Sequence, residues 1–237
     1  MKKLKVYLTN FPQAKILDIG TGRGNFISLI DYIYNDYSEI IGIDVLDYLL
    51  DMNRENFKTN PKIKFIEDDI LNTNLAKESF DVICLSNTLH HLENIKATFR
   101  EMRRLLKPQG IIIVNEMISD NLNEKQISHK LLHHFAAKVD MRFGNYHQAT
   151  FTENQIKKTL SELADLSMID TWKLDIDLSN EAEDTNQLVK IIDRLLEQVK
   201  VCDDYEVFLE EANEIKTYLK NNGFDNATQV VLVLKRV

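Results

Sequence analysis

Residues 16–26, Ile16-Leu-Asp-Ile-Gly-Thr-Gly-Arg-Gly-Asn-Phe26, decide the fold of this chain. A short apolar run contains Asp18, glycines occupy the alternate positions 20, 22 and 24, and an amphipathic stretch follows from Phe26 to Ile33. The pattern predicts a β-strand, a tight turn that favours glycine, and a helix whose N-terminus faces a ligand. Because glycine has no Cβ, a bulky polar ligand can approach the backbone closely. We therefore expect a nucleotide-like ligand at this turn.

The spacing of the three glycines separates two classes of such ligands. A dinucleotide fingerprint, Gly-x-Gly-x-x-Gly, needs its third glycine at position 25, which is Asn25, whereas the glycine here is Gly24. A phosphate-binding P-loop needs Gly-Lys-Ser or Gly-Lys-Thr, and the loop has neither. A nicotinamide-dependent oxidoreductase is therefore disfavoured, although binding of NADH would revive it.

Strand-like and helix-like stretches alternate over the first 120 residues. Apolar runs predict strands at 15–19, 40–44, 63–67, 80–86 and 111–116, and amphipathic stretches predict helices at about 24–34, 46–58 and 95–106. A further helix at 152–164, a strand at 172–178 and a last strand at 229–235 are expected. This alternation indicates βαβ units and a Rossmann-like, doubly wound α/β fold.

Two helical insertions interrupt the alternating pattern. Residues 120–147 form a histidine-rich insertion after the fifth strand, and residues 181–222 form a helical hairpin before the last strand. The hairpin is expected to pack on the sheet, to act as a lid or to join two copies in a homodimer. Its apolar stripes are Leu188, Ile191, Ile192, Leu195, Leu196 and Val199, then Tyr205, Phe208, Leu209, Ala212, Ile215 and Leu219. We expect the whole chain, 1–237, to be a single domain.

Composition excludes several classes of partner. The chain has 29 basic and 37 acidic residues, and this net charge of −8 weighs against nucleic acid, which usually needs a basic surface. No apolar run approaches the ~20 residues that span a bilayer, so no membrane partner is expected. Cys84 and Cys202 give no disulfide framework and predict a cytoplasmic location.

Acidic residues follow the second and third predicted strands. Asp44 lies about 20 residues past the glycine loop, where an acid in such folds accepts hydrogen bonds from ribose hydroxyls. A helix N-cap explains the residue type of Asp44 but not its spacing. Asp69 ends the Phe65–Ile70 segment, and Asp68 is a near alternative to it. Together with segments 80–92 and 105–110, these motifs resemble the class I S-adenosylmethionine (SAM)-dependent methyltransferases, in particular small-molecule enzymes of the ubiquinone- and menaquinone-biosynthesis type. The resemblance covers about residues 14–116, and weakly residues 151–178.

The resemblance implies a seven-stranded sheet, mostly parallel with an antiparallel last strand, and SAM as the cofactor. By this resemblance the glycine loop holds the methionine end of SAM, and Asp44 binds its ribose. Asp69 and Ile70 bind the adenine, and the backbone near Leu85 and Ser86 lines the other side of the cofactor. The implied cofactor-binding residues are Asp18, Gly20, Thr21, Gly22, Gly24, Asp44, Val45, Asp69, Ile70, Leu85 and Ser86. The sequence departs from the family at Gln109, where a second glycine is usual.

Methyl transfer from a sulfonium is an in-line displacement, so the protein mainly aligns the acceptor and excludes water. His91 and Glu116, which follow the fourth strand and end the fifth, are the expected catalytic groups. Segment 86–88 reads Ser-Asn-Thr, which is neither Asp/Asn-Pro-Pro-Tyr/Phe nor Pro-Cys, so methylation of nucleobases is disfavoured. A small-molecule acceptor is therefore expected. A non-catalytic SAM-binding or assembly factor is the alternative from another class.

Histidines gather in the 120–147 insertion. On a continuous helix, His129, His133 and Asp140 lie within about 40° of one another at ~100° per residue. His-x-x-x-His on one helix face is metal-ligand spacing, and His147 or Glu116 would complete a set for a divalent metal. Two other interpretations stay open: a solvated stripe, or a metal-free acid–base or substrate-binding role.

Overall fold

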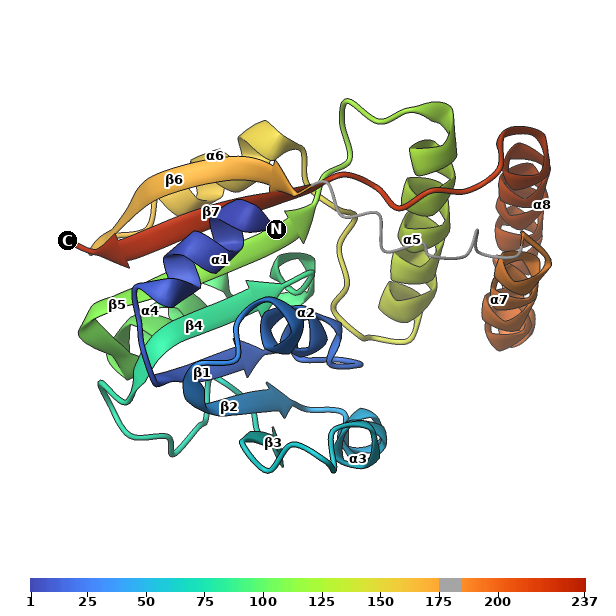
Figure 1. Ribbon diagram of the computed structural model, residues 1–237. Coiled ribbons are helices and arrows are strands. Elements are labelled where there is room, and N and C mark those ends of the chain that lie inside the picture. Colours follow the sequence, from blue (N-terminus) through green and yellow to red (C-terminus); the bar gives the residue numbers. More distant parts are fainter. Residues whose placement is uncertain (175–184) are drawn as a thin grey trace.

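The computed structural model describes residues 1–174 and 185–237, and its strands form one seven-stranded sheet in the order β3-β2-β1-β4-β5-β7-β6 (Figure 1). Strands β1 to β5 are parallel, whereas β7 pairs antiparallel with both β5 and β6. The predicted Rossmann-like sheet, mostly parallel with an antiparallel last strand, is confirmed. The strands are β1 (Ala14–Ile19), β2 (Tyr37–Asp44), β3 (Ile63–Glu67), β4 (Phe80–Ser86), β5 (Leu106–Met117), β6 (Leu166–Leu174) and β7 (Gln229–Arg236).

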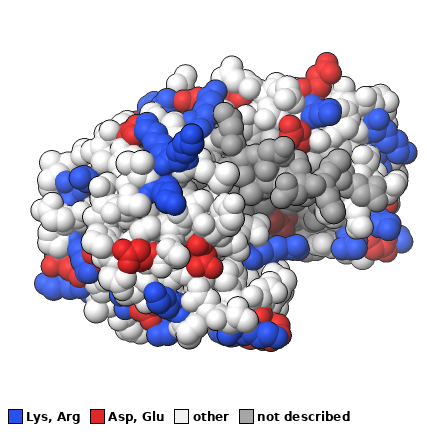
Figure 2. Space-filling model, viewed as in Figure 1, with Lys and Arg blue, Asp and Glu red and all other residues white. Residues whose placement is uncertain are grey.

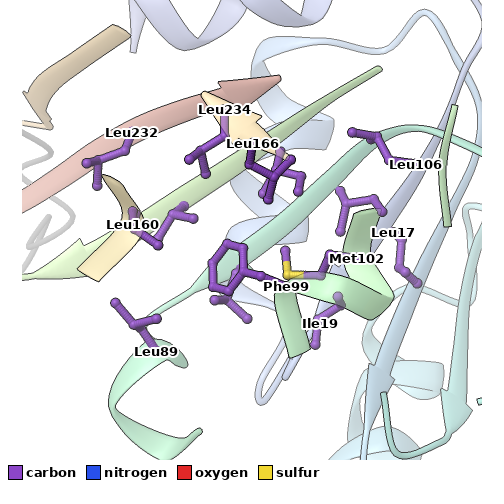
Figure 3. Packing of buried hydrophobic residues seen from close by; sticks show 14 of the residues in the cluster. Leu17, Ile19, Leu89, Phe99, Met102, Leu106, Leu160, Leu166, Leu232 and Leu234 are labelled. Carbon is purple, nitrogen blue, oxygen red and sulfur yellow. The ribbon is translucent and has the colours of Figure 1, made fainter. Parts of the chain in front are cut away.

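Helices cover both faces of the sheet. Buried apolar side chains of α1 (Lys2–Thr9), α2 (Asn25–Ile33) and α3 (Asp47–Asn56) form a core with one face, and those of α4 (Ile95–Leu105) and α6 (Glu153–Ser161) form a core with the other. Successive side chains of a strand point to opposite faces, so Ile16 joins the first core and Leu17 the second. Figure 3 shows Phe99 and Met102 of α4 within this second core.

Three further helices, α5 (Glu124–Arg142), α7 (Thr185–Gln198) and α8 (Tyr205–Asn222), form a layer that we call the helical cap. In Figure 1 the cap stands beyond the carboxyl ends of β1, β4 and β5. The hairpin of α7 and α8 packs its apolar stripes on α5 rather than on a face of the sheet. The core of the cap contains Phe135, Val139, Leu188, Ile192, Leu196, Val199, Phe208, Ala212, Ile215 and Leu219.

Several elements differ from the sequence predictions. Strand β5 begins at Leu106, directly after α4, so segment 107–110 belongs to the strand and not to a separate turn. Strand β6 begins at Leu166, before the predicted start at residue 172, and residues 175–178 of that prediction lie outside the described residues, as do 181–184 of the predicted hairpin. The short helix α1 was not predicted at all. Among the described residues, none of the helices has the length and apolar character needed to cross a membrane.

Candidate functional site

A cleft of about 1210 Å³ opens at the carboxyl edge of the sheet, and residues 144–147 after α5 form part of its wall. It lies at the ends of β1 and β4, neighbouring strands that are not consecutive in the chain. Ligands of open α/β sheets bind at such a switch point. In Figure 2 the surface is hollowed between the body of the molecule and the helical cap.

The glycine loop forms the floor of this cleft. Gly20 has a φ of +64°, and a Cβ at this position would lie 2.4 Å from Cγ2 of Thr88, so no larger residue fits the turn. Gly22 has a φ of +50°, yet a Cβ there would meet nothing within 4 Å. Gly22 therefore presents bare backbone to the cleft. Gly24 does not line the cleft; it caps α2 and lies against Phe57.

Asp44 and Asp69 end or follow neighbouring strands, and both line the cleft, as do Val45 and Ile70. The carboxylate of Asp44 accepts hydrogen bonds from the amide of Gly22 at 2.8 Å and from the amide of Leu46 at 3.0 Å. Asp69 accepts hydrogen bonds from the amide of Leu71 at 2.9 Å and from the side chain of Asn72 at 2.7 Å. These bonds fix both acids at the edge of the cleft, where the sequence prediction expects them to meet a ligand.

Asp18, which belongs to β1, and Thr21, which lies within the glycine loop, are both buried and do not line the cleft. Asp18 is 1% exposed and accepts a hydrogen bond from the Thr21 hydroxyl at Oδ2, 2.8 Å away. Its Oδ1 is buried and has no hydrogen-bond partner among the described residues. Burial raises the pKa of the Asp18 carboxyl from 3.8 to about 7, although the hydrogen bond from Thr21 lowers it.

Leu85 and Ser86 do not line the cleft, in contrast to the position that the resemblance implied for them. Leu85 is completely buried in the core, and the Ser86 hydroxyl accepts a hydrogen bond from Asn115 at 2.9 Å. The wall of the cleft is formed instead by Asn87 and Thr88, which directly follow β4. The difference arises because β4 remains paired with β5 as far as Ser86.

Of the two predicted catalytic residues, His91 reaches the cleft and Glu116 does not. Glu116 is completely buried; its Oε2 accepts a hydrogen bond from the amide of Leu89 at 3.0 Å, and its Oε1 lies 2.6 Å from Nδ1 of His90. Leu89 and His90 belong to the short helix η1 (Leu89–His91). Glu116 therefore positions His90 and η1 and does not itself contact an acceptor.

A histidine cluster joins η1 to α5 and to the segment after it. Nε2 of His133 lies 3.1 Å from Nε2 of His90 and 3.2 Å from Nε2 of His147. Asp140 contacts the cluster through its Oδ2, 2.6 Å from Nδ1 of His147. Burial, followed by the neighbouring imidazoles, lowers the pKa of His133 to about 2, so this ring is neutral. The ring of His91 lies against that of His147, with centroids 3.9 Å apart and the two planes tilted by 37°.

His129 lies outside the histidine cluster, although its helical spacing predicts a metal ligand beside His133. Its Nδ1 accepts a hydrogen bond from the amide of Ala227 at 3.0 Å, and its ring packs against Phe224. The cluster instead contains His90, which sequence reasoning did not select. Two sequence features point to His90: the His90–His91 pair follows the fourth strand at the carboxyl edge of the sheet, and Glu116 lies near the end of the fifth strand. Parallel pairing of β4 with β5 brings these residues together.

The chain is similar in sequence and in fold to known methyltransferases. Residues 17–114 match a family model described as a methyltransferase domain. This segment is a methyltransferase domain. The fold of the whole chain is that of class I SAM-dependent methyltransferases. A SAM-dependent methyltransferase from Thiobacillus denitrificans, solved with S-adenosyl-L-homocysteine, is 16% identical with a TM-score of 0.61, covering 100% of this chain and 90% of that one.

Other relatives of the methyltransferase domain differ in their reactions. The [4+2]-cyclase SpnF has a TM-score of 0.61 at 16% identity, covering 99% of this chain and 80% of that one. Phosphoethanolamine N-methyltransferase of Plasmodium falciparum (isolate 3D7) is 31% identical over 105 residues, which are 44% of this chain and 39% of that protein. The hybrid PKS-NRPS synthetase iliA of Neonectria sp. (strain DH2) is 33% identical over 113 residues, 45% of this chain and 3% of that protein. The chain thus spans less than two-fifths of the length of these curated relatives.

Proposed function

We propose that this chain transfers a methyl group from SAM to a small-molecule acceptor. The observation that carries the proposal is the bare backbone at Gly22 beside Asp44, with Asp69 after the next strand, in a cleft large enough for a cofactor and an acceptor. A cleft of this size at the switch point of the sheet suits a nucleoside ligand.

The charge of the cleft favours SAM over a dinucleotide. Asp44, Asp68, Asp69, Glu93 and Asp140 line the cleft, and no lysine or arginine is among the described residues that do so. A sulfonium and an ammonium are attracted by such a lining, whereas a pyrophosphate is repelled. The orphaned Oδ1 of Asp18 beneath the loop adds a further buried acceptor near the end expected to hold the methionine.

Apolar side chains in the cleft suit the adenine ring. Val45, Leu46, Tyr48, Ile70 and Leu71 line the half of the cleft around Asp44 and Asp69. Four of these residues are exposed large hydrophobic side chains: Val45, Leu46, Tyr48 and Leu71. Binding a flat apolar ring would remove part of this surface from water.

The chain's own residues would align the acceptor and exclude water. SAM, when bound, supplies a methyl group on a positively charged sulfur, which leaves without needing an acid. His91 and His147 line the cleft together with segment 144–146, so they would contact an acceptor there. The acidic lining favours a neutral or cationic acceptor over a phosphorylated one.

Isothermal titration calorimetry with SAM, S-adenosyl-L-homocysteine and NADH tests the proposal. We expect both SAM and its demethylated product to bind with one site per chain and NADH not to bind. Asp69→Asn is expected to weaken SAM binding, and Glu67→Gln, at a nearby exposed acid that does not line the cleft, is the control that should retain it. Binding of NADH but not SAM would refute the proposal. Binding of SAM without methyl transfer to any of a panel of metabolites would favour the non-catalytic alternative.

A cytoplasmic location and pairing of two copies through α7 and α8 stay predictions. On the hairpin, Val201 is 86% exposed and Val207 65% exposed, which supports an apolar contact between copies. Size-exclusion chromatography with light scattering tests the pairing, since Val207→Glu should then reduce the mass to that of a monomer.

A further inference from the structure

Three imidazole nitrogens converge on one point at the boundary between the sheet and the helical cap. Nε2 of His133 lies 3.1 Å from that of His90 and 3.2 Å from that of His147, and the ligand atoms of the three residues all lie within 4.8 Å of one another. His90 comes from η1, His133 from α5, and His147 from the segment after α5. His90 is 1% exposed and His147 is 5% exposed.

Carboxylates fix the orientation of two of these rings. Nδ1 of His90 lies 2.6 Å from Oε1 of Glu116, and Nδ1 of His147 lies 2.6 Å from Oδ2 of Asp140. In each pair the carboxylate oxygen accepts a hydrogen bond from Nδ1, so Nε2 is the ring nitrogen left for a further partner. In both rings that Nε2 faces Nε2 of His133. Three ring nitrogens thus face one another, which is an arrangement that a bound cation satisfies.

We propose that His90, His133 and His147 bind a divalent transition-metal ion, Zn²⁺ in the first instance, through their three Nε2 atoms. In a tetrahedral site with Zn–N bonds of about 2.0–2.1 Å, ligand nitrogens lie about 3.3 Å apart, close to the two measured separations. The Glu116–His90 and Asp140–His147 pairs form the carboxylate–histidine–metal arrangement that holds such ligands in place.

This centre differs from the ligand set that helical spacing predicts. His90 replaces His129, whose Nδ1 is bonded to the amide of Ala227. Asp140 orients His147 and is not a ligand itself. A helix-based pattern finds only residues one or two turns apart, whereas this centre joins three segments that the fold brings together.

The three histidines leave a fourth coordination position, as in catalytic zinc sites. Because His147 and Asp140 line the cleft, a water or an acceptor oxygen, nitrogen or sulfur could occupy that position. A metal-bound hydroxyl or thiol loses its proton more readily, which would prepare it for methylation. This role rests on the proposed function, whereas binding of the metal does not.

Metal analysis and calorimetry test the centre directly. The 237-residue chain, purified without a histidine tag, is stripped of metal with a chelator and titrated with Zn²⁺. We expect one Zn²⁺ per chain in wild type, no stoichiometric binding in His133→Ala, and unchanged binding in His129→Asn. The last is a matched control on the same helix, since its Oδ1 can still accept from Ala227. Asp140→Asn should bind Zn²⁺ about tenfold more weakly.

Thermal melting in the presence and absence of Zn²⁺ shows whether each variant is folded, because only a folded chain with the site gains stability from the ion. Replacement by Co²⁺ provides a visible absorption spectrum, which azide should alter if the fourth position is open. Failure of the stripped, folded wild type to bind Zn²⁺ would overturn the proposal, as would equal loss in His129→Asn and His133→Ala. Calorimetry with SAM on the same samples measures cofactor binding independently of Zn²⁺ binding, so failure of the metal proposal and failure of the proposed function can be told apart.

Discussion

Gly20→Ala and Gly22→Ala separate the packing role of the glycine loop from its role towards a ligand. Both residues have positive φ, so an alanine at either position costs about 1–2 kcal/mol in backbone strain. At Gly22 nothing lies within 4 Å of the added Cβ, and this strain is the whole cost.

At Gly20 the added Cβ would lie 2.4 Å from Cγ2 and 2.7 Å from Oγ1 of Thr88, well inside the ~3.5 Å of an ordinary contact. Thr88 must then move, which disturbs its hydrogen bonds to the carbonyls of Gly20 at 3.2 Å and Ser86 at 2.9 Å. The displacement of Thr88 and the weakening of its shared hydroxyl hydrogen bond add about 2 kcal/mol to the strain, so the total cost in Gly20→Ala is about 3–4 kcal/mol.

Urea denaturation and SAM calorimetry on the two variants measure these effects. We expect Gly22→Ala to unfold with a free energy about 1–2 kcal/mol below wild type, yet to lose most of its affinity for SAM. Gly20→Ala should be the less stable variant by about 2 kcal/mol. Removal of the Thr88 methyl group in the double variant Gly20→Ala/Thr88→Ser should recover part of that loss. Wild-type affinity for SAM in Gly22→Ala would refute the view that the ligand approaches this backbone.

Three further predictions concern buried groups. Because the pKa of Asp18 is raised in the folded protein, its contribution to the free energy of unfolding falls as pH rises from about 4 to about 7 and stays low above pH 7. Asp18→Asn should therefore remove up to about 4 kcal/mol of the pH dependence of the unfolding free energy, measured by urea denaturation at a series of pH values. The same pH dependence in wild type and Asp18→Asn would contradict this prediction. Ile192→Ala in the cap core should cost about 2–5 kcal/mol in urea denaturation, whereas Ile191→Ala, 40% exposed, should change stability by less than about 1 kcal/mol; equal losses would argue against the packing of α7. Burial raises the pKa of the Cys84 thiol, so iodoacetamide should label Cys202 first in the native protein; mass spectrometry showing early labelling of Cys84 would refute its burial.

Local patterns in the sequence predict the sheet closely. The bounds of β3 and β4 agree with the predicted 63–67 and 80–86, because both strands are apolar runs with polar residues on either side. The glycine loop and the two acids are similarly local: each follows a strand, and parallel strands place their carboxyl ends at one edge. Their meeting at one cleft could therefore be predicted without knowing any long-range contact.

The histidine cluster could not be predicted in the same way. Helical periodicity relates His129 to His133 but contains nothing about which loop faces α5. The partners of His133 are set by how the cap lies over the sheet, which brings in His90 from η1 and His147 from beyond the end of α5. The role of Glu116 as a support for His90 likewise depends on the pairing of β4 with β5.

A crystal structure of the chain with S-adenosyl-L-homocysteine bound tests the central claim most directly. We expect the ribose at Asp44, the adenine beside Asp69 and Ile70, and the sulfur directed towards the part of the cleft that His91 and His147 line. Electron density for the ligand outside this cleft, or with its adenine away from Asp69 and its sulfur directed away from the histidines, would contradict it.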